Sequence, residues 1–207
     1  MYAAANGHDD TVAKLLESNE IDADSSDNDG QTPLSLAAER GHAAVVKLLL
    51  NTGKVETNSR DYCGWTPLSY AVVNEHDLVV KLLLERNDID ADLRDNDGRT
   101  PLLWAATSEN KAVVELLLNT GNVDVDARDD NGRTPLWWSA ASGNEAVVEL
   151  LLERNAKADS RDNRGWTLLS YAAERWHEAV VRLMALKLLG GSIYKPITIF
   201  HPRDGKS

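Results

Sequence analysis

A motif that recurs about every 34 residues constrains this chain more than any other feature. The recurring glycines are Gly30, Gly64, Gly98, Gly132 and Gly165. One variable residue after each of the first four comes a Thr-Pro-Leu triplet, beginning at Thr32, Thr66, Thr100 and Thr134, and the fifth copy reads Thr167-Leu168-Leu169. Each unit continues to a run of Val and Leu, such as residues 45–50. Self-similarity at this period predicts a protein built from stacked units that bury apolar faces against one another.

Each unit is predicted to form two short helices followed by a hairpin. The threonine is a good helix N-cap, and the proline after it occupies the first helical position, where it loses no hydrogen bond. The Val and Leu positions of the second segment are spaced as one face of a helix. The residue that follows is always one that tolerates a left-handed helix stop: Asn19, Gly53, Asn87, Gly121 or Asn155. The acidic stretch after it, rich in Asp, Asn and Gly, predicts a turn or hairpin.

The repeat divides the chain into six units and a tail. The units are a partial one at residues 1–26, four copies at 27–60, 61–94, 95–128 and 129–161, and a divergent last copy at 162–189. Residues 190–207 are a non-repeat tail. We expect either that its apolar residues fold back as a cap over the last unit or that the tail is disordered. Those residues are Ile193, Tyr194, Ile197, Ile199 and Phe200.

The charge balance narrows the class of partner. The chain has 33 acidic and 22 basic residues, a formal net charge of −11 at pH 7, and such a surface repels nucleic acid and anionic membranes. The single cysteine, Cys63, forms no intrachain disulfide, and the first residues are not a secretory signal. No apolar stretch approaches the roughly 20 residues that span a bilayer. These features predict a soluble protein of the cytoplasm or the nucleus that is not secreted.

The repeated frame resembles the ankyrin repeat. The frame D-x-x-G-x-T-P-L-x-x-A-A-x-x-G-H-x-x-V-V-x-L-L-L covers residues 1–189, with four near-complete copies. The resemblance implies an all-α repeat protein, an ankyrin-repeat solenoid of helix-turn-helix-hairpin units of about 34 residues. A hairpin longer by one residue, and an aromatic residue two positions after Thr-Pro-Leu, resemble the ankyrin arrays of filamentous fungi. Those arrays are often attached to nucleotide-binding signalling proteins.

Two columns depart from the family's frame. The histidine usual after Thr-Pro-Leu is replaced by Ser35, Ser69, Leu103, Trp137 and Ser170, so we expect its inter-repeat hydrogen bonds to be reorganised. The glycine between the two helices is kept at Gly7, Gly41 and Gly143 but becomes Glu75, Glu109 and Trp176, where we expect strained or altered turns. The next position holds His8, His42, His76, Asn110, Asn144 and His177. We expect these histidines to hydrogen-bond the inter-helix turn.

The sequence offers no constellation for catalysis, a metal or a cofactor. The terminal Gly-Lys-Ser lacks the upstream glycine of a phosphate-binding loop, and the Asp-Asn-Asp-Gly segments lack the glutamate of a calcium loop. One histidine per repeat spaces these rings too far apart to share a metal. We therefore expect a non-enzyme with no small-molecule substrate.

Recurring Arg-Asp pairs predict a ladder of exposed ion pairs along the hairpins. The pairs are Arg60-Asp61, Arg94-Asp95, Arg128-Asp129 and Arg161-Asp162, and an acidic column accompanies them at Asp22, Glu56, Asp90 and Asp124. Stacked arginines would repel one another unless carboxylates lie between them. Each exposed pair of this kind contributes about 0–1 kcal/mol.

Two columns are candidates for contact with a protein partner. The hairpin-tip column holds Gln31, Trp65, Arg99, Arg133 and Trp166, a position that commonly touches the target in ankyrin proteins. The first-helix column holds Leu36, Tyr70, Trp104, Trp138 and Tyr171. Packing between neighbouring helices is the favoured interpretation of its aromatic residues, whereas Trp65 and Trp166 have little to pack against in a polar hairpin. Adjacent helical residues point about 100° apart, so we expect Trp137 to pack towards a neighbouring repeat and Trp138 to face the groove.

The leading functional prediction is a non-catalytic protein–protein interaction module. Such a scaffold or recognition array would bind a protein partner of unknown identity through its concave face and hairpin tips. The alternative is a regulatory or sensor fragment of a larger fungal nucleotide-binding signalling protein whose ATPase domain is absent from this chain. Specificity in such arrays lies in variable positions that carry no generic code, so the partner, the pathway and the oligomeric state stay open.

Overall fold

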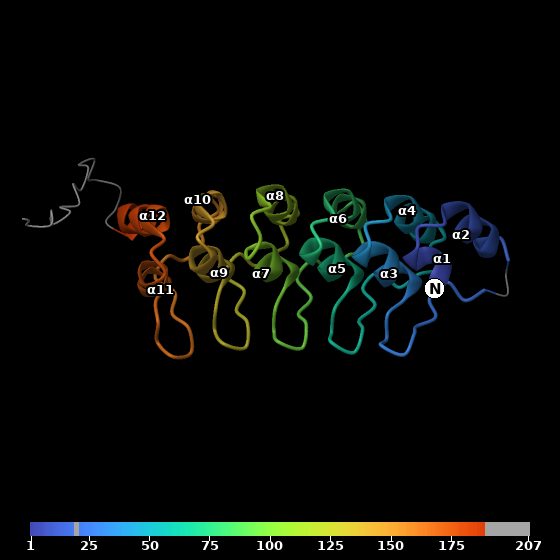
Figure 1. Cartoon of the computed structure of the whole chain (residues 1–207), viewed down its shortest axis with the longest axis horizontal. Helices are drawn as coiled ribbons and strands as arrows, with labels where there is room; N and C mark the ends of the chain where they lie inside the picture. Colours follow the sequence, from blue (N-terminus) through green and yellow to red (C-terminus); the bar gives the residue numbers. More distant parts are fainter. Residues whose placement is uncertain (19–20, 189–207) are drawn as a thin grey trace, which may run out of the picture.

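The computed structural model describes residues 1–18 and 21–188, and these residues form two rows of helices with hairpins projecting from one side (Figure 1). The first row contains α1 (Tyr2–Ala5), α3 (Pro33–Glu39), α5 (Pro67–Val73), α7 (Pro101–Ala105), α9 (Pro135–Ser142) and α11 (Leu168–Glu174). The second row contains α2 (Asp9–Leu16), α4 (Ala43–Asn51), α6 (Asp77–Leu84), α8 (Lys111–Asn119), α10 (Glu145–Glu153) and α12 (Glu178–Leu188). The described residues contain no strand beyond one isolated bridge between Arg161 and Thr167, so the all-α solenoid is confirmed.

Threonine caps begin the first helix of every unit after the partial first one, as predicted. The Oγ1 atom of Thr32 accepts the backbone N–H of Ser35 at 3.2 Å, which satisfies one of the free donors of the first turn. Equivalent bonds form at Thr66, Thr100, Thr134 and Thr167. Proline follows the first four of these caps at the first helical position.

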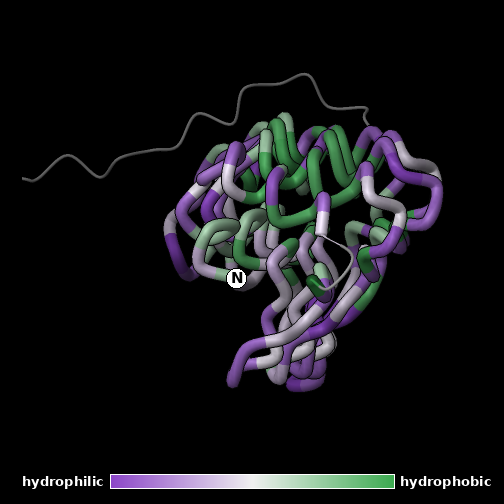
Figure 2. Tube along the Cα trace, turned by 90° about the vertical axis from the view of Figure 1, so that its right-hand side faces the viewer, coloured by the Kyte–Doolittle hydropathy of each residue, from purple (hydrophilic) through white to green (hydrophobic). Residues whose placement is uncertain are grey.

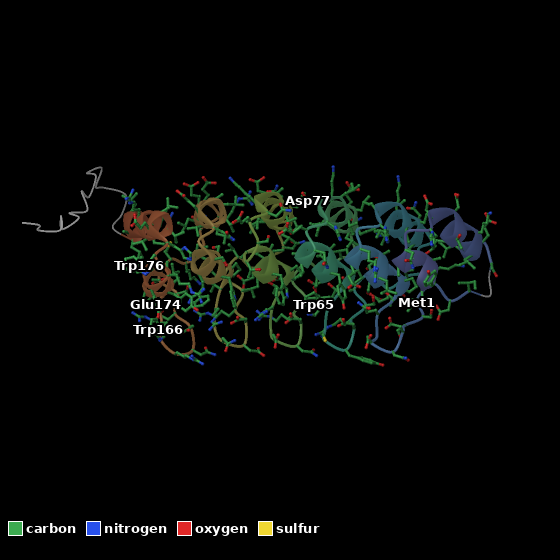
Figure 3. All side chains as sticks on the ribbon, in the orientation of Figure 1. Met1, Trp65, Asp77, Trp166, Glu174 and Trp176 are labelled. Carbon is green, nitrogen blue, oxygen red and sulfur yellow. The ribbon has the colours of Figure 1, made fainter. Side chains whose placement is uncertain are left out.

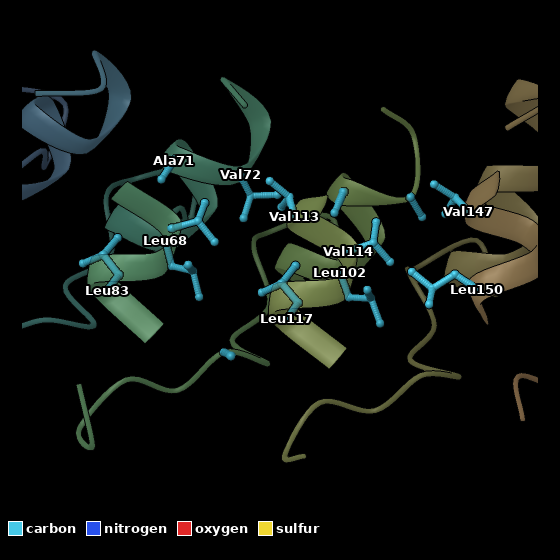
Figure 4. Packing of buried hydrophobic residues seen from close by; sticks show 14 of the residues in the cluster. Leu68, Ala71, Val72, Leu83, Leu102, Val113, Val114, Leu117, Val147 and Leu150 are labelled. Atoms are coloured by element: carbon cyan, nitrogen blue, oxygen red, sulfur yellow. The ribbon is translucent and has the colours of Figure 1, made fainter. Parts of the chain in front are cut away.

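The core lies between the two helical rows and continues from unit to unit. Hydrophobic residues gather in the helices, whereas the hairpins are largely hydrophilic (Figure 2). Leu68 and Leu102 of the first row pack with Leu83 and Leu117 of the second, and all four side chains are fully buried (Figure 4). Each unit therefore completes its core only with the help of its neighbours.

Left-handed residues end three of the second helices where the sequence predicts them. Gly53, Gly121 and Asn155 have φ values of 63°, 76° and 65°. The prediction is wrong at Asn87, which does not have a positive φ. The last turn of α6 is closed by Arg86, whose N–H donates to Leu83 at 3.0 Å. Asn19 and the expected cap by residues 192–207 lie outside the described residues.

The predicted ladder of ion pairs along the hairpins is wrong. We call Arg60, Arg94, Arg128 and Arg161 the hairpin arginines. Within the described residues none of them pairs with a carboxylate, because each donates to backbone carbonyls instead. Arg128, for example, reaches the carbonyls of Gly132 in its own hairpin and Arg161 in the next, both at 3.0 Å.

Carboxylates of the hairpins also accept backbone N–H groups across units. The Oδ2 atom of Asp24 accepts the N–H of Glu56 in the next unit at 3.1 Å, and Asp92 accepts that of Asp124 at 3.1 Å. Backbone donors and acceptors are present at the same positions of every hairpin whatever the side chains. Side-chain-to-backbone bonds therefore set the register of neighbouring units.

The serines that replace the family's histidine keep their polar contact within one unit. The hydroxyls of Thr32 and Ser35 lie 3.1 Å apart, and those of Thr66 and Ser69 are also 3.1 Å apart. Leu103 and Trp137 fill the same position with buried apolar side chains. The expected reorganisation of the hydrogen bonds is thus confirmed at these positions.

Histidines of the inter-helix column bond to the turn of the preceding unit. The Nε2 atom of His76 donates to the carbonyl of Glu39 at 2.9 Å, and His42 and His177 make equivalent bonds to Ala5 and Ala141. A Cβ atom added at Gly41 would come within 2.7 Å of the His76 ring. The expected role in the turn is confirmed, and it crosses from one unit to the next.

The size of the side chain in the histidine column depends on the turn residue of the preceding unit, against which it packs. The histidines follow units with glycine in the turn, in the pairs Gly7–His42, Gly41–His76 and Gly143–His177. The shorter asparagine, Asn110 or Asn144, follows the units with Glu75 or Glu109. Glu75 and Trp176 have positive φ values of 58° and 63°, as the expected strain requires, whereas α7 ends early before Glu109 and its turn is altered.

We predict that the pairing of turn residue and column residue contributes to the free energy of unfolding. Asn110→His should lower the free energy of unfolding by about 1–3 kcal/mol, because the ring would meet the Cβ atom of Glu75. Glu75→Gly combined with Asn110→His should recover the part of the loss due to this contact. Urea denaturation of both single variants and the double variant measures the coupling.

The cycle has a built-in control, because the cap bond from Val113 to Asn110 is lost in both variants that carry histidine. Gly41→Ala provides the converse change beneath His76 and should also destabilise. Additive effects of Glu75→Gly and Asn110→His would show that the two positions do not interact.

We predict that Trp137 contributes to the stability of the fold as a core residue does. Its side chain is only 1% exposed, so Trp137→Ala should lower the free energy of unfolding by about 3–5 kcal/mol. Trp138→Ala, in the adjacent and half-buried position, is the matched control and should cost clearly less. Equal losses in urea denaturation would contradict the separate environments of the two rings.

Candidate protein-binding surface

One aspartate in each hairpin positions the tip residue. The Oδ1 atom of Asp95 accepts the backbone N–H groups of Asp97 at 2.9 Å and Arg99 at 2.8 Å, which closes the turn around Gly98. The equivalent carboxylates are those of Asp27, Asp61, Asp129 and Asp162. The hairpin-tip column therefore has a fixed backbone in every unit.

The same aspartate also fixes an aromatic side chain of the first-helix column. The Oδ2 atom of Asp95 accepts the ring N–H of Trp104 at 2.9 Å, and that of Asp129 accepts the ring N–H of Trp138 at 3.1 Å. In the preceding unit the hydroxyl of Tyr70 donates to Asp61 at 2.5 Å. Burial, and then this hydrogen bond, raise the pKa of Tyr70 above its ordinary value, so the phenol stays a donor.

These bonds bring the two columns into one continuous stack. The ring centroid of Trp65 lies 5.1 Å from that of Tyr70 and 5.1 Å from that of Trp104. The Arg99 guanidinium carbon lies 4.4 Å from the Trp104 ring and 5.2 Å from the Trp138 ring. Arg133 lies 4.4 Å from Trp137 and 5.1 Å from Trp138.

The stack continues into the last unit. The ring of Trp137 lies 4.6 Å from that of Tyr171, and the guanidinium of Arg175 lies 5.1 Å from the Tyr171 ring. We call the whole set the aromatic–arginine row; it consists of Tyr70, Trp65, Trp104, Arg99, Trp138, Arg133, Trp137, Tyr171 and Arg175. From Trp104 to Trp137 the rings alternate with the guanidinium groups of Arg99 and Arg133, an arrangement that the attraction between cations and aromatic faces stabilises.

The predicted packing of the first-helix aromatics agrees with these contacts. Tyr70, Trp104, Trp138 and Tyr171 are all partly buried. The expectation that Trp65 has little to pack against is wrong, because its ring fills the space between Tyr70 and Trp104. Trp166 is 46% exposed, and both tip tryptophans are labelled in Figure 3.

The remaining candidates lie at the amino-terminal side of the row. The side-chain amide of Gln31 donates to the carboxylate of Glu39 at 3.3 Å, and Leu36 is partly buried. Gln31 also interacts with Tyr70 of the next unit, so it adjoins the first ring of the row. Contact with a partner stays a prediction for Gln31 as for every other candidate.

Trp137 and Trp138 occupy the different environments that helical geometry predicts. Trp137 is buried against the next unit, whereas Trp138 lies partly exposed in the row. Their rings nevertheless contact each other edge to face, with centroids 5.3 Å apart, and both contact Arg133. This shared arginine could not be inferred from helical spacing, because it comes from the hairpin.

Sequence reasoning missed the linking role of the aspartates. Asp61, Asp95 and Asp129 each precede their aromatic partner by nine residues, and this constant spacing was the available signal. Interpreting these residues as members of an ion-pair ladder obscured it. Two negative charges placed beneath the row, those of Asp95 and Asp129, are thereby buried and fully hydrogen-bonded.

Other chemistry is not assembled in the described part of the chain. No group of three or more His, Cys, Asp or Glu side chains there could hold a metal ion. No described helix is long and apolar enough to cross a membrane. Cys63 is an exposed thiol at a hairpin tip.

Comparison with known proteins agrees with the repeated architecture. The family model for ankyrin repeats (3 copies) matches residues 1–95, 80–162 and 122–193. A comparison with curated proteins gives no match. Ankyrin repeats are generally protein–protein interaction modules. The matches extend over most of the chain, and the chain belongs to the ankyrin-repeat family.

Proposed function

We propose that this protein is a non-catalytic binding module that holds a protein partner along the aromatic–arginine row. The single observation that carries the proposal is the continuity of this row across successive units. Aromatic and arginine side chains are the types most enriched at binding hot spots. A row of them, in a family of interaction modules, is the surface best suited to a protein partner.

The rigidity of the row supports binding rather than simple packing. Trp104 and Trp138 are held by hydrogen bonds to buried carboxylates, and Arg99 and Arg133 are stacked against these rings. Side chains that are already ordered lose little entropy when a partner docks, which favours affinity. Partial exposure leaves these side chains a face to offer.

The proposed partner lies along the row and extends to Trp166 at the last hairpin. An indole that is 46% exposed in a binding module has apolar area left to bury. The alternative of a fungal signalling fragment, and the cytoplasmic or nuclear location, stay predictions, because the family match speaks to neither.

Affinity capture with a row variant tests the proposal. We expect Trp65→Ala/Arg99→Ala/Arg133→Ala/Trp166→Ala to lose protein partners that the wild type retains, because the anchors of the interface are removed. Quantitative mass spectrometry of the captured proteins provides the measurement. Circular dichroism and thermal melting establish that the variant remains folded.

A matched control carries substitutions among exposed residues of the second helices and the last turn. Leu78→Ala/Trp176→Ala/Arg182→Ala removes comparable side chains outside the row. The control should keep the partners of the wild type. Identical partners for the row variant and the wild type would rule the row out as the binding surface.

A further inference from the structure

Arg99 and Arg133 of the row differ from the four hairpin arginines in their hydrogen bonds. Each hairpin arginine donates hydrogen bonds to backbone carbonyls of its own hairpin, and three of them also reach the next hairpin. The guanidinium groups of Arg99 and Arg133 make no hydrogen bond or ion pair with any described residue. Their donors are therefore free for another molecule.

The stacked geometry decides which donors are available. The Nε atoms of Arg99 and Arg133 are buried and have no hydrogen-bond partner. The Nη atoms are not buried in this way, so they form the open edge of each guanidinium plane. A planar pair of N–H donors matches the two oxygens of a carboxylate, and such charge-assisted bidentate bonds are the strongest of the side-chain hydrogen bonds.

The two guanidinium groups are close enough to act on one segment. Arg99 and Arg133 lie 5.2 Å and 5.1 Å from the centroid of the same Trp138 ring, so their carbons are at most about 10 Å apart, comparable to the spacing of packed helices. Residues three apart in a polyproline II helix project from the same face and are separated by about 9 Å. In a β-strand, residues two apart share a face and are separated by about 7 Å, which the same limit admits, so the spacing of the carboxylates in test peptides decides between the two conformations.

We propose that Arg99 and Arg133 recognise two carboxylates three residues apart on an extended polyproline II segment of the partner. This inference rests on the proposed function and names the chemistry of the partner. Aromatic-lined grooves are the surfaces on which such segments dock, and Trp65, Trp104 and Trp138 supply the rings. The two unpaired cations supply the selection for acidic side chains.

The net charge of the chain, −11, does not oppose this pairing at close range. Charges farther than about 8 Å from the segment are screened at physiological ionic strength. The carboxylates of Asp95 and Asp129, which bind the indoles of the row, are buried and already accept N–H donors. They therefore do not pair with the two guanidinium groups.

Peptide titration tests the inference directly. The probe is a proline-rich peptide with two glutamates three residues apart, measured at physiological salt by calorimetry and by the intrinsic tryptophan fluorescence of the protein. The analogue with glutamine in both positions should bind about tenfold or more weakly, because the charge-assisted bonds are lost. Peptides whose glutamates are two or five residues apart should also bind more weakly than the probe.

Variants of the protein provide the complementary arm. Arg99→Gln and Arg133→Gln should each weaken binding of the probe by about tenfold or more. Each variant should then bind the probe no more tightly than a peptide in which the glutamate facing the substituted arginine is replaced by glutamine. Arg182→Gln makes the same charge change on α12, outside the row, and should bind the probe as the wild type does. Thermal melting shows that each variant remains folded.

Several results would overturn the inference. Equal affinity for the glutamine peptide would show that the carboxylates are not recognised. A glutamate spacing of two that binds more tightly would exclude the polyproline II geometry. Tighter binding of a single-stranded oligonucleotide or a phosphoserine peptide would replace the carboxylate with phosphate.

The capture experiment separates this inference from the function on which it rests. If Arg99→Gln/Arg133→Gln retains the partners that the four-residue row variant loses, the carboxylate inference is wrong and the binding row stands. If the row variant also retains them, the proposed function fails.

Discussion

Burial of one unit's apolar face against the next is the interaction on which the rest of this structure depends. Leu68 and Leu102 complete their core only with side chains of neighbouring units. Backbone bonds between successive hairpins, such as that from Tyr62 to Asp29 at 3.1 Å, extend the same register to the hairpin side. Equivalent positions are consequently superimposed, and a side chain repeated in the sequence becomes a column on the surface.

The repeated geometry of the hairpins joins two such columns into one row. A single carboxylate, that of Asp95 for example, closes the turn at Arg99 and binds the ring of Trp104. One carboxylate therefore sets the positions of the tip residue and of the aromatic ring relative to each other. In the middle of the row, the guanidinium groups of Arg99 and Arg133 then alternate with rings from the helices, and the row is ordered before any partner arrives.

Local rules predict much of this fold, and contacts between units account for what they miss. The caps at Thr32 and its equivalents depend on residues close in sequence, so their pattern predicts them well. The sequence does not predict the packing of Trp65, because its partner Trp104 belongs to the next unit. It does not predict the bonds of the hairpin arginines either, because backbone carbonyls, which leave no mark in a sequence, compete with carboxylates.

The central claim is that the aromatic–arginine row is a preformed surface whose free donors belong to Arg99 and Arg133. Nuclear magnetic resonance of the arginine and indole N–H groups, recorded while a binding partner is added, tests this claim most directly. The account predicts that the guanidinium signals of Arg99 and Arg133 shift on binding, while those of Arg60, Arg94 and Arg128, which are already bonded to backbone carbonyls, stay unchanged. Shifts confined to residues of the second helices, such as Lys111 and Arg182, would contradict it.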